Sequence, residues 1–246
     1  MTEFKTGAIR PVECFKEGWE LIKDQYWLLF GITFVGIFIG AFSMYILLGA
    51  MMCGIYFCYL QKIDGKIVSF DGLWFGFEKF LPSFVLLLLM LIPVIIVYVI
   101  IYIPIMIAAM MASRLSSDEL MLLFGGAIIV DVILIVLMTC FHTLLMFSFP
   151  LIIDRNLGAW QSITTSAKAV WRNLGGIAGM LGVAIVVSIL ATVLTCGFGA
   201  YFLMPIMFAG YAVAYRKVFP ALGNQGFNPP PPPSAFQGAG SYNQNV

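Results

Sequence analysis

The sequence predicts an all-α polytopic membrane protein with six transmembrane helices in three hairpins, each preceded by a cytoplasmic interfacial amphipathic helix. Composition is the first ground: 61% of the residues are hydrophobic, 10% are charged and the mean hydropathy is +1.00, whereas a soluble domain carries about 25% charged residues. Several apolar runs also exceed the about 20 residues that cross a bilayer, without the alternation of strands. Finally, an amphipathic stretch leads into an apolar run three times.

The first amphipathic stretch runs from Pro11 to Tyr26 and leads into the apolar run that starts at Trp27. Its apolar side chains recur at helical spacing, and its charged side chains lie mostly elsewhere around the helix. We expect the first hairpin at about Trp27–Leu60, as two short helices that turn near Gly40–Ser43. The alternative is one helix, about Leu28–Leu48, followed by a partly buried segment.

The second stretch, Ser69–Phe80, leads into a longer hairpin. One helix is expected at about Leu81–Ala112 and its partner at about Glu119–Ile153. At 1.5 Å per residue, a continuous helix of either length reaches about 48 Å or more, so each must tilt, kink or project from the membrane. Proline is a common cause of helix kinks, and these segments contain Pro93, Pro104 and Pro150.

The third stretch, Gly158–Asn173, precedes expected helices at about Leu174–Leu194 and Phe198–Phe219. Together these elements make residues 1–220 a helical membrane domain. Residues 221–246 are uncharged and rich in Pro, Gly, Asn and Gln, which predicts a disordered cytoplasmic tail. Its run Pro229–Pro233 is of the kind that proline-recognition modules bind, which would give a protein partner, although a plain solvated tail is the simpler interpretation.

Charge placement sets the expected orientation, because cytoplasmic loops are enriched in Lys and Arg. With six spans and both termini in the cytoplasm, every Lys and Arg except Arg114 falls on the cytoplasmic side. A single helix in the first region would instead place Lys62, Lys66 and Lys79 outside. We therefore expect a multi-pass protein of the cytoplasmic membrane. A net charge of +1 gives no reason to expect nucleic-acid binding.

The three amphipathic stretches carry aromatic and basic residues that favour the membrane interface. Trp and Tyr prefer this zone because one end of the ring is apolar and the other is wet. A helix that lies in the plane of the interface is the expected outcome; the alternative is that the stretches are extended cytoplasmic ends of membrane helices. The candidate anchors are Trp19, Trp74, Trp160, Trp171, Lys168 and Arg172.

Two ionisable residues lie inside an expected membrane helix, where such residues are the default functional candidates. Asp131 and His142 are eleven residues apart, close to three helical turns, so both point the same way about 16 Å apart. They are candidates for a proton path or for the polar lining of a cavity. The alternative is a structural role, in which each hydrogen-bonds a neighbouring helix with the help of nearby hydroxyl groups.

No motif of a soluble catalytic site is present, which argues against an enzyme: the sequence lacks a P-loop, a dinucleotide-binding glycine pattern, HExxH and GxSxG. One histidine and five scattered cysteines give no reason to expect a metal or another cofactor. The GxxxG pairs Gly36–Gly40 and Gly175–Gly179 allow close helix packing, either within the chain or between copies. The oligomeric state is left open.

The chain resembles an uncharacterised family of bacterial multi-pass membrane proteins, similar to the membrane domain found beside glycerophosphodiester phosphodiesterases. The resemblance implies the six-helix layout with interfacial helices and a bacterial inner membrane. The phosphodiesterase domain itself is absent, so its activity does not carry over, and no site residues are implied. The segments that carry the resemblance are Gly54–Tyr56, Gly65–Lys66, Ser69–Phe77, Phe149–Asp154, Ala159–Trp171 with Asn173, and Gly197–Gly199 through Pro205 to Tyr211.

Two functions follow as hypotheses. The first is a non-enzymatic protein that organises membrane lipids or partner proteins at the inner leaflet, because three aromatic-rich stretches face an outer side with almost no charge. The second is a transporter or channel for a small or lipid-like solute that uses Asp131 and His142. A polar cavity that reaches Asp131 would favour transport, whereas a packed helix interface there would favour a structural role.

Overall fold

A computed structural model describes residues 4–110 and 116–221, and every regular element in these ranges is helical. The predicted tail at 221–246, with Pro229–Pro233, lies outside the described residues apart from residue 221, as does Arg114. The elements are α1 (Pro11–Ile22), η1 (Lys23–Gln25), α2 (Tyr26–Phe42), α3 (Leu48–Ile63), η2 (Phe70–Lys79), α4 (Phe80–Val97), η3 (Tyr98–Tyr102), α5 (Ile103–Met110), α6 (Ser117–Leu144), α7 (Ser148–Arg155), α8 (Ala159–Arg172), α9 (Leu174–Leu194) and α10 (Gly199–Val218).

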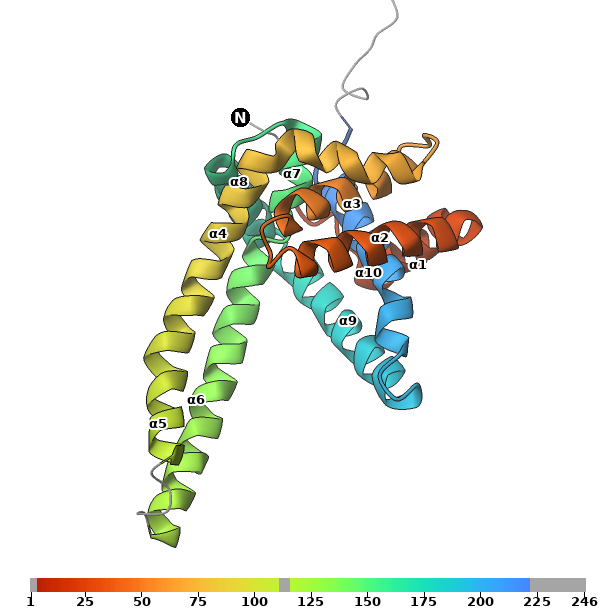
Figure 1. The fold of residues 1–246 in the computed structure, drawn as a ribbon. Coiled ribbons are helices and arrows are strands. Elements are labelled where there is room, and N and C mark those ends of the chain that lie inside the picture. The colour runs from red at the N-terminus through yellow and green to blue at the C-terminus, as the bar shows by residue number, and fades with distance from the viewer. Residues whose placement is uncertain (1–3, 111–115, 222–246) are drawn as a thin grey trace, which may run out of the picture.

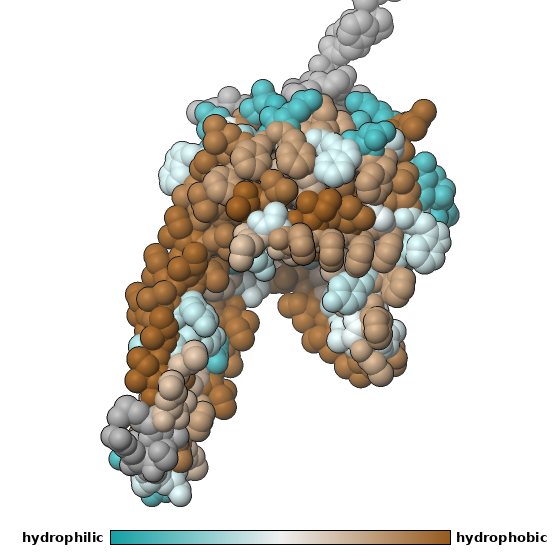
Figure 2. Space-filling model, in the orientation of Figure 1, coloured by the Kyte–Doolittle hydropathy of each residue, from teal (hydrophilic) through white to brown (hydrophobic). Residues whose placement is uncertain are grey.

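The molecule has a compact end and two projecting legs (Figure 1). The compact end contains α1, α2, α3, α7 and α8. One leg consists of α4 and α5 with α6, and the other of α9 with α10. Hydrophilic residues gather on the compact end and hydrophobic residues cover the legs, with a second small hydrophilic group at the tip of the longer leg (Figure 2).

Within residues 4–110 and 116–221, four helical segments are long and apolar enough to cross a membrane, which indicates a membrane protein. They are Pro11–Phe42, Phe70–Met110, Ser117–Arg155 and Leu174–Leu194, and the apolar helix α3 is shorter. The six predicted spans stay a prediction. In Figure 1, α2 runs across the molecule and is not parallel to α4 or α6, so the first two apolar helices do not simply continue the direction of the legs.

Helix α3 forms the centre of the compact end. Its buried surface includes four small residues, which let neighbouring backbones approach closely. These residues are Gly49, Ala50, Cys53 and Gly54. The 3₁₀-helix η2 crosses α3 where Gly76 faces the backbone of Ala50 and Gly54. The helical spacing expected over Ser69–Phe80 is therefore realised as a tighter helix, since two glycines in this stretch weaken the α-helical alternative.

The first apolar region contains two helices, α2 and α3, joined by a turn at residues 43–47. The turn lies slightly later than the expected Gly40–Ser43, and α2 ends well before Leu48, where the single-helix alternative would have ended. Gly36 and Gly40 pack α2 against Ile55 and Leu48 of α3. This GxxxG pair thus serves packing within the chain.

The second GxxxG region behaves differently. Gly179 faces Pro11, and its neighbour Gly176 faces Ile9, so α9 packs on the start of α1. Gly175 and Gly182 have no heavy atom near the position of an added Cβ. Only part of the glycine pattern on α9 therefore serves packing within the described chain.

The helix expected at Glu119–Ile153 is interrupted, which corrects the sequence prediction. Helix α6 ends at Leu144, and α7 begins at Ser148 and turns into the compact end. Pro150 lacks an N–H and its ring would clash with the carbonyl of Met146 in a continuous helix. Ser166 of α8 repairs the break: its hydroxyl donates to the Leu144 carbonyl at 2.7 Å and accepts from the Phe147 N–H at 3.2 Å.

The other long segment is helical from Phe80 to Met110, but not uniformly α-helical. Pro93 lies within α4, whereas the five-residue π-helix η3 lies just before Pro104. Because Pro104 has no N–H to offer the carbonyl one turn earlier, the local hydrogen-bond pattern changes there. Only one of the two expected kink sites in this segment thus coincides with an irregular turn.

The two ends of the described chain meet on the charged face of the compact end. The Lys5 N–H donates to the Val218 carbonyl at 2.9 Å. Asn173, only 4% exposed, holds the same N-terminal segment: it accepts from the Gly7 N–H at 2.7 Å and donates to the Lys5 carbonyl at 3.1 Å. Both ends therefore lie on one side of the molecule.

Candidate functional site

A cleft of about 560 Å³ lies below the compact end, between the two legs. Its walls come from α3, α4, α6, α7, α9 and α10, and Figure 2 shows the surface hollowed between the legs. Most lining groups are apolar, and four are the flexible side chains of Met52, Met90, Met138 and Met146. Since both legs are covered by hydrophobic residues, the cleft opens beside surfaces suited to lipid.

Five polar side chains line this cleft: Tyr56, Thr139, His142, Thr143 and Tyr211. The Thr143 hydroxyl donates to the Thr139 carbonyl at 2.6 Å. His142 Nδ1 lies 2.8 Å from the Met138 carbonyl; because a carbonyl only accepts, Nδ1 carries the proton of this bond. Nε2 of His142 is then left for another partner. His142 thus contacts its own helix rather than a neighbouring one.

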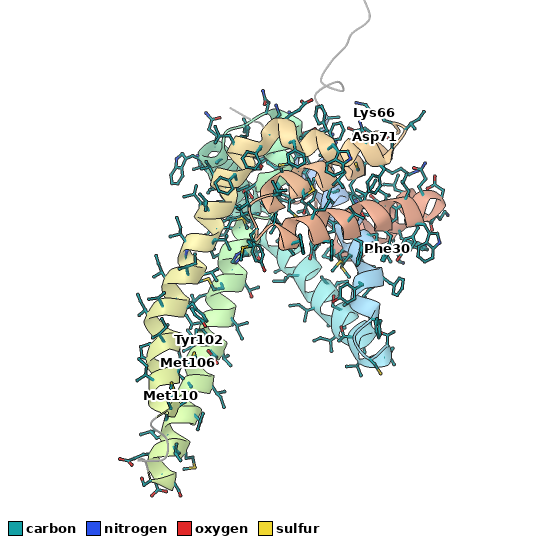
Figure 3. The ribbon with its side chains drawn as sticks, in the orientation of Figure 1. Phe30, Lys66, Asp71, Tyr102, Met106 and Met110 are labelled. Carbon is teal, nitrogen blue, oxygen red and sulfur yellow. The ribbon has the colours of Figure 1, made fainter. Side chains whose placement is uncertain are left out.

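Asp131 does not share the cleft with His142, although both lie on one face of α6. The cleft lining on α6 begins at Ile135, one turn beyond Asp131. Asp131 lies beside Tyr102 of η3, and its Oδ1 atom is buried without a hydrogen-bond partner among the described residues. Figure 3 shows Tyr102 on the longer leg, away from the charged end where Lys66 and Asp71 lie. The two sequence candidates are therefore not joined by one polar cavity.

All four predicted tryptophan anchors are partly exposed. The exposed fraction is 41% for Trp19 and 45% for Trp74, against 68% for Trp160 and 67% for Trp171. Lys168 is also exposed, and the Arg172 guanidinium lies 5.6 Å from the centre of the Phe4 ring. Lys168, Trp171 and Arg172 line one shallow surface depression together, so the structure brings three of the six anchors together.

Four phenylalanines form an aromatic stripe on α2 that was not among the sequence predictions. Phe30, Phe34, Phe38 and Phe42 stack at successive spacings of four residues, with ring centroids 5.9 to 6.4 Å apart. Phe202 of α10 stacks on Phe30 at 5.5 Å, and Figure 3 shows Phe30 on α2. The signal was present in the sequence as a repeat of four, which is the spacing of one helix face.

A partly exposed ion network joins α10 to the ends of α3 and α7 on the charged face. Arg216 of α10 donates to Asp64 through Nε at 2.9 Å and Nη2 at 2.6 Å, and its Nη1 lies 2.8 Å from Asp154 Oδ1. Tyr215 donates to Asp154 at 2.8 Å. Asp64 and Asp154 are far apart in the sequence, so the sequence alone did not indicate that they share one cation.

Two further ion pairs extend this face to α1 and η1. Lys62 pairs with Asp24 at 2.6 Å, and Lys217 pairs with Glu17 at 2.8 Å. The five cysteines are free, with Cys14, Cys53 and Cys58 buried. In residues 4–110 and 116–221, no three His, Cys, Asp or Glu side chains lie close enough to hold a metal ion.

No protein-family model matches the chain, and neither the curated proteins nor the solved structures searched include a match. The function therefore has to be argued from the cleft, the charged face and the aromatic residues themselves.

Proposed function

We propose that the protein is a non-enzymatic integral membrane protein that organises lipids, or partner proteins, at the inner leaflet of a bacterial cytoplasmic membrane. The observation that carries this proposal is the uneven distribution of polar groups. Most of them gather on the charged compact end, whose elements carry partly exposed tryptophans, whereas the legs are mainly apolar apart from the small hydrophilic group at the tip of the longer one. Tryptophan favours the zone between headgroups and hydrocarbon. Basic residues on the same face suit anionic lipids and a cytoplasmic orientation.

The legs are the membrane-crossing parts in this proposal. Helix α9 has 21 residues, and the helical stretch from Phe80 to Met110 is longer, so both reach across about 30 Å of hydrocarbon. Helices α2 and α3 have 17 and 16 residues. In place of the first spanning hairpin of the six-span layout, we propose that they enter only the leaflet beneath the charged face. The Lys62–Asp24 pair holds the outer ends of this hairpin at that face.

Cysteine labelling distinguishes these layouts. In a background with the exposed Cys140 and Cys196 replaced by Ser, Ile46→Cys reports on the turn between α2 and α3. We expect a membrane-impermeant maleimide to miss this position from either side of sealed vesicles and to label it after detergent is added. Ser117→Cys and Lys66→Cys serve as references for the two sides. Labelling of Ile46→Cys from the Ser117 side would instead support six spans.

The tryptophan anchors give the functional test. Joint replacement of Trp19, Trp74 and Trp171 by Ser removes interfacial rings without altering the cleft, whereas the matched Trp→Phe variant keeps aromatic bulk. We expect the Ser variant to lose most of the lipids or proteins that copurify with the wild type, and the Phe variant to retain about half or more. Mass spectrometry of the purified samples measures both. The same copurified set in all three proteins would rule out this function for the anchors.

A solute transporter remains the second candidate because of one observation, the buried and unpaired Oδ1 atom of Asp131. Ionisable groups at membrane depth often mark ion or substrate paths. Under this alternative, Asp131→Asn abolishes a pH-dependent flux in proteoliposomes. Under the lipid-organising proposal, wild-type proteoliposomes show no such flux and Asp131→Asn leaves the copurified lipids unchanged.

A further inference from the structure

We propose that the cleft between the legs binds one uncharged lipid, whose polar end offers carbonyl oxygens to the Tyr56 and Tyr211 hydroxyls and a hydroxyl donor to His142 Nε2. The inference rests on the proposed membrane location, since the ligand must arrive from the bilayer. It adds the class of lipid, the site and the groups that recognise it.

The cleft has the size and walls of a ligand site. Its volume of about 560 Å³ falls within the range of about 300–1,000 Å³ that is usual for small-molecule sites. The lining is mainly apolar with a few polar groups, as in such sites. Four methionines among the lining residues adapt readily to chains of different shape. This lining suits a long hydrocarbon chain better than a rigid polar solute.

Three polar groups in the lining are available to such a ligand. Tyr56 and Tyr211 both line the cleft, and Tyr56 is only 6% exposed. His142 uses Nδ1 for its own helix and leaves Nε2 free. A polar group in apolar surroundings is costly without a partner. The two tyrosine hydroxyls can therefore donate to carbonyl oxygens of a ligand, and the unprotonated Nε2 can accept from a ligand hydroxyl group.

The absence of charge selects the ligand class. No Lys, Arg, Asp or Glu of residues 4–110 and 116–221 lines the cleft. A phosphate or ammonium headgroup would lose its hydration there without an opposite charge, which is far more costly than burying a neutral oxygen. An uncharged lipid of the diacylglycerol type therefore fits, whereas a phospholipid with the same chains does not.

The test uses the full chain in detergent, with dioleoylglycerol as the probe and native mass spectrometry as the readout. We expect one bound molecule, and an affinity at least about tenfold weaker in the Tyr56→Phe/Tyr211→Phe double variant, which loses two hydrogen bonds but keeps both rings. Tyr98→Phe, on an exposed residue outside the cleft, is the matched control and should bind as the wild type does. Leu181→Trp, which fills the cleft, should abolish binding.

Dioleoylphosphatidylglycerol carries the same chains with an anionic head and should not compete for the site. The proposal is overturned if the wild type binds no stoichiometric dioleoylglycerol, if the anionic lipid competes equally, or if the Tyr→Phe pair binds like the Tyr98→Phe control. Thermal unfolding of each variant identifies one that fails to fold. The tryptophan variants test the general lipid-organising function separately, since none of those residues lines the cleft.

Discussion

Replacing Gly54 by Ala is expected to cost about 3–5 kcal/mol of stability, the range of the most damaging single substitutions. A Cβ at this position would overlap the carbonyl group of the buried Leu73. The group that a Cβ at Gly54 would meet is the backbone of Leu73, which cannot rotate away as the end of a side chain could. Helix η2 must therefore move away from α3. In thermal unfolding of the detergent-solubilised protein, this corresponds to a fall in Tm of about 10 °C.

Gly182→Ala is the matched control for this prediction. Gly182 lies on α9 with nothing near the position of an added Cβ, and Ala is a better helix former than Gly by about 1 kcal/mol. The same chemical change is thus expected to raise the Tm slightly at Gly182 and to lower it strongly at Gly54. Equal effects at the two positions would contradict the close backbone contact between α3 and η2.

Arg216→Met is expected to cost about 2–3 kcal/mol, because it removes the cation that Asp64 and Asp154 share, although Asp154 keeps its pair with Arg155 at 3.1 Å. The side chains of Arg216, Asp64 and Asp154 are 11%, 22% and 13% exposed, so water compensates the lost charge poorly. The measurement is again thermal unfolding in detergent. Loss of the pair should release the end of α10 from both α3 and α7.

Two further variants make this prediction specific. Arg10→Met removes an exposed pair with Glu13, with side chains 75% and 50% exposed, and should change stability by less than about 1 kcal/mol. Adding Asp64→Asn to Arg216→Met should recover part of the loss, because it removes the carboxylate left without a cation, whereas Asp154 is kept because it also pairs with Arg155 at 3.1 Å. An Arg216→Met protein as stable as Arg10→Met would show that the network does not hold the fold.

The helices of the legs were the most predictable part of the fold. Long apolar runs leave few alternatives in a bilayer, because backbone polar groups must be satisfied within the helix. The expected helix at Leu174–Leu194 has the bounds of α9, and the next differs from α10 by one residue at each end. The bounds of both helices followed from local composition alone, without knowledge of any tertiary partner.

The interruption between α6 and α7 could not be predicted in the same way. Pro150 marked an irregular site, but its effect depends on Ser166, which lies on another helix and satisfies the freed backbone groups. Similarly, η2 is tight because its glycines meet α3. Such features follow from tertiary contacts, which local propensity does not report.

The candidate site was predictable in part. The polar residues of α6 and the exposed tryptophans were identified from their setting in apolar or amphipathic sequence. The cleft and the Arg216 network were not, because their members are far apart in the chain: Arg216 and Asp64 are separated by 152 positions. Tyr56 and Tyr211 lie in one cleft only because six helices of the folded chain surround it, so their sequence positions did not identify them as a pair.

The central claim, that the charged end lies at the lipid–water interface with the legs in the hydrocarbon, is tested most directly by quenching of tryptophan fluorescence with brominated lipids. The chain has five tryptophans, all of them partly exposed on α1, α2, η2 and α8, so the signal comes only from these elements. We expect strong quenching by lipids brominated near the ester end of the acyl chain and weak quenching by lipids brominated near the methyl end. Equal or stronger quenching by the deeper bromines, or none by either lipid, would contradict the account.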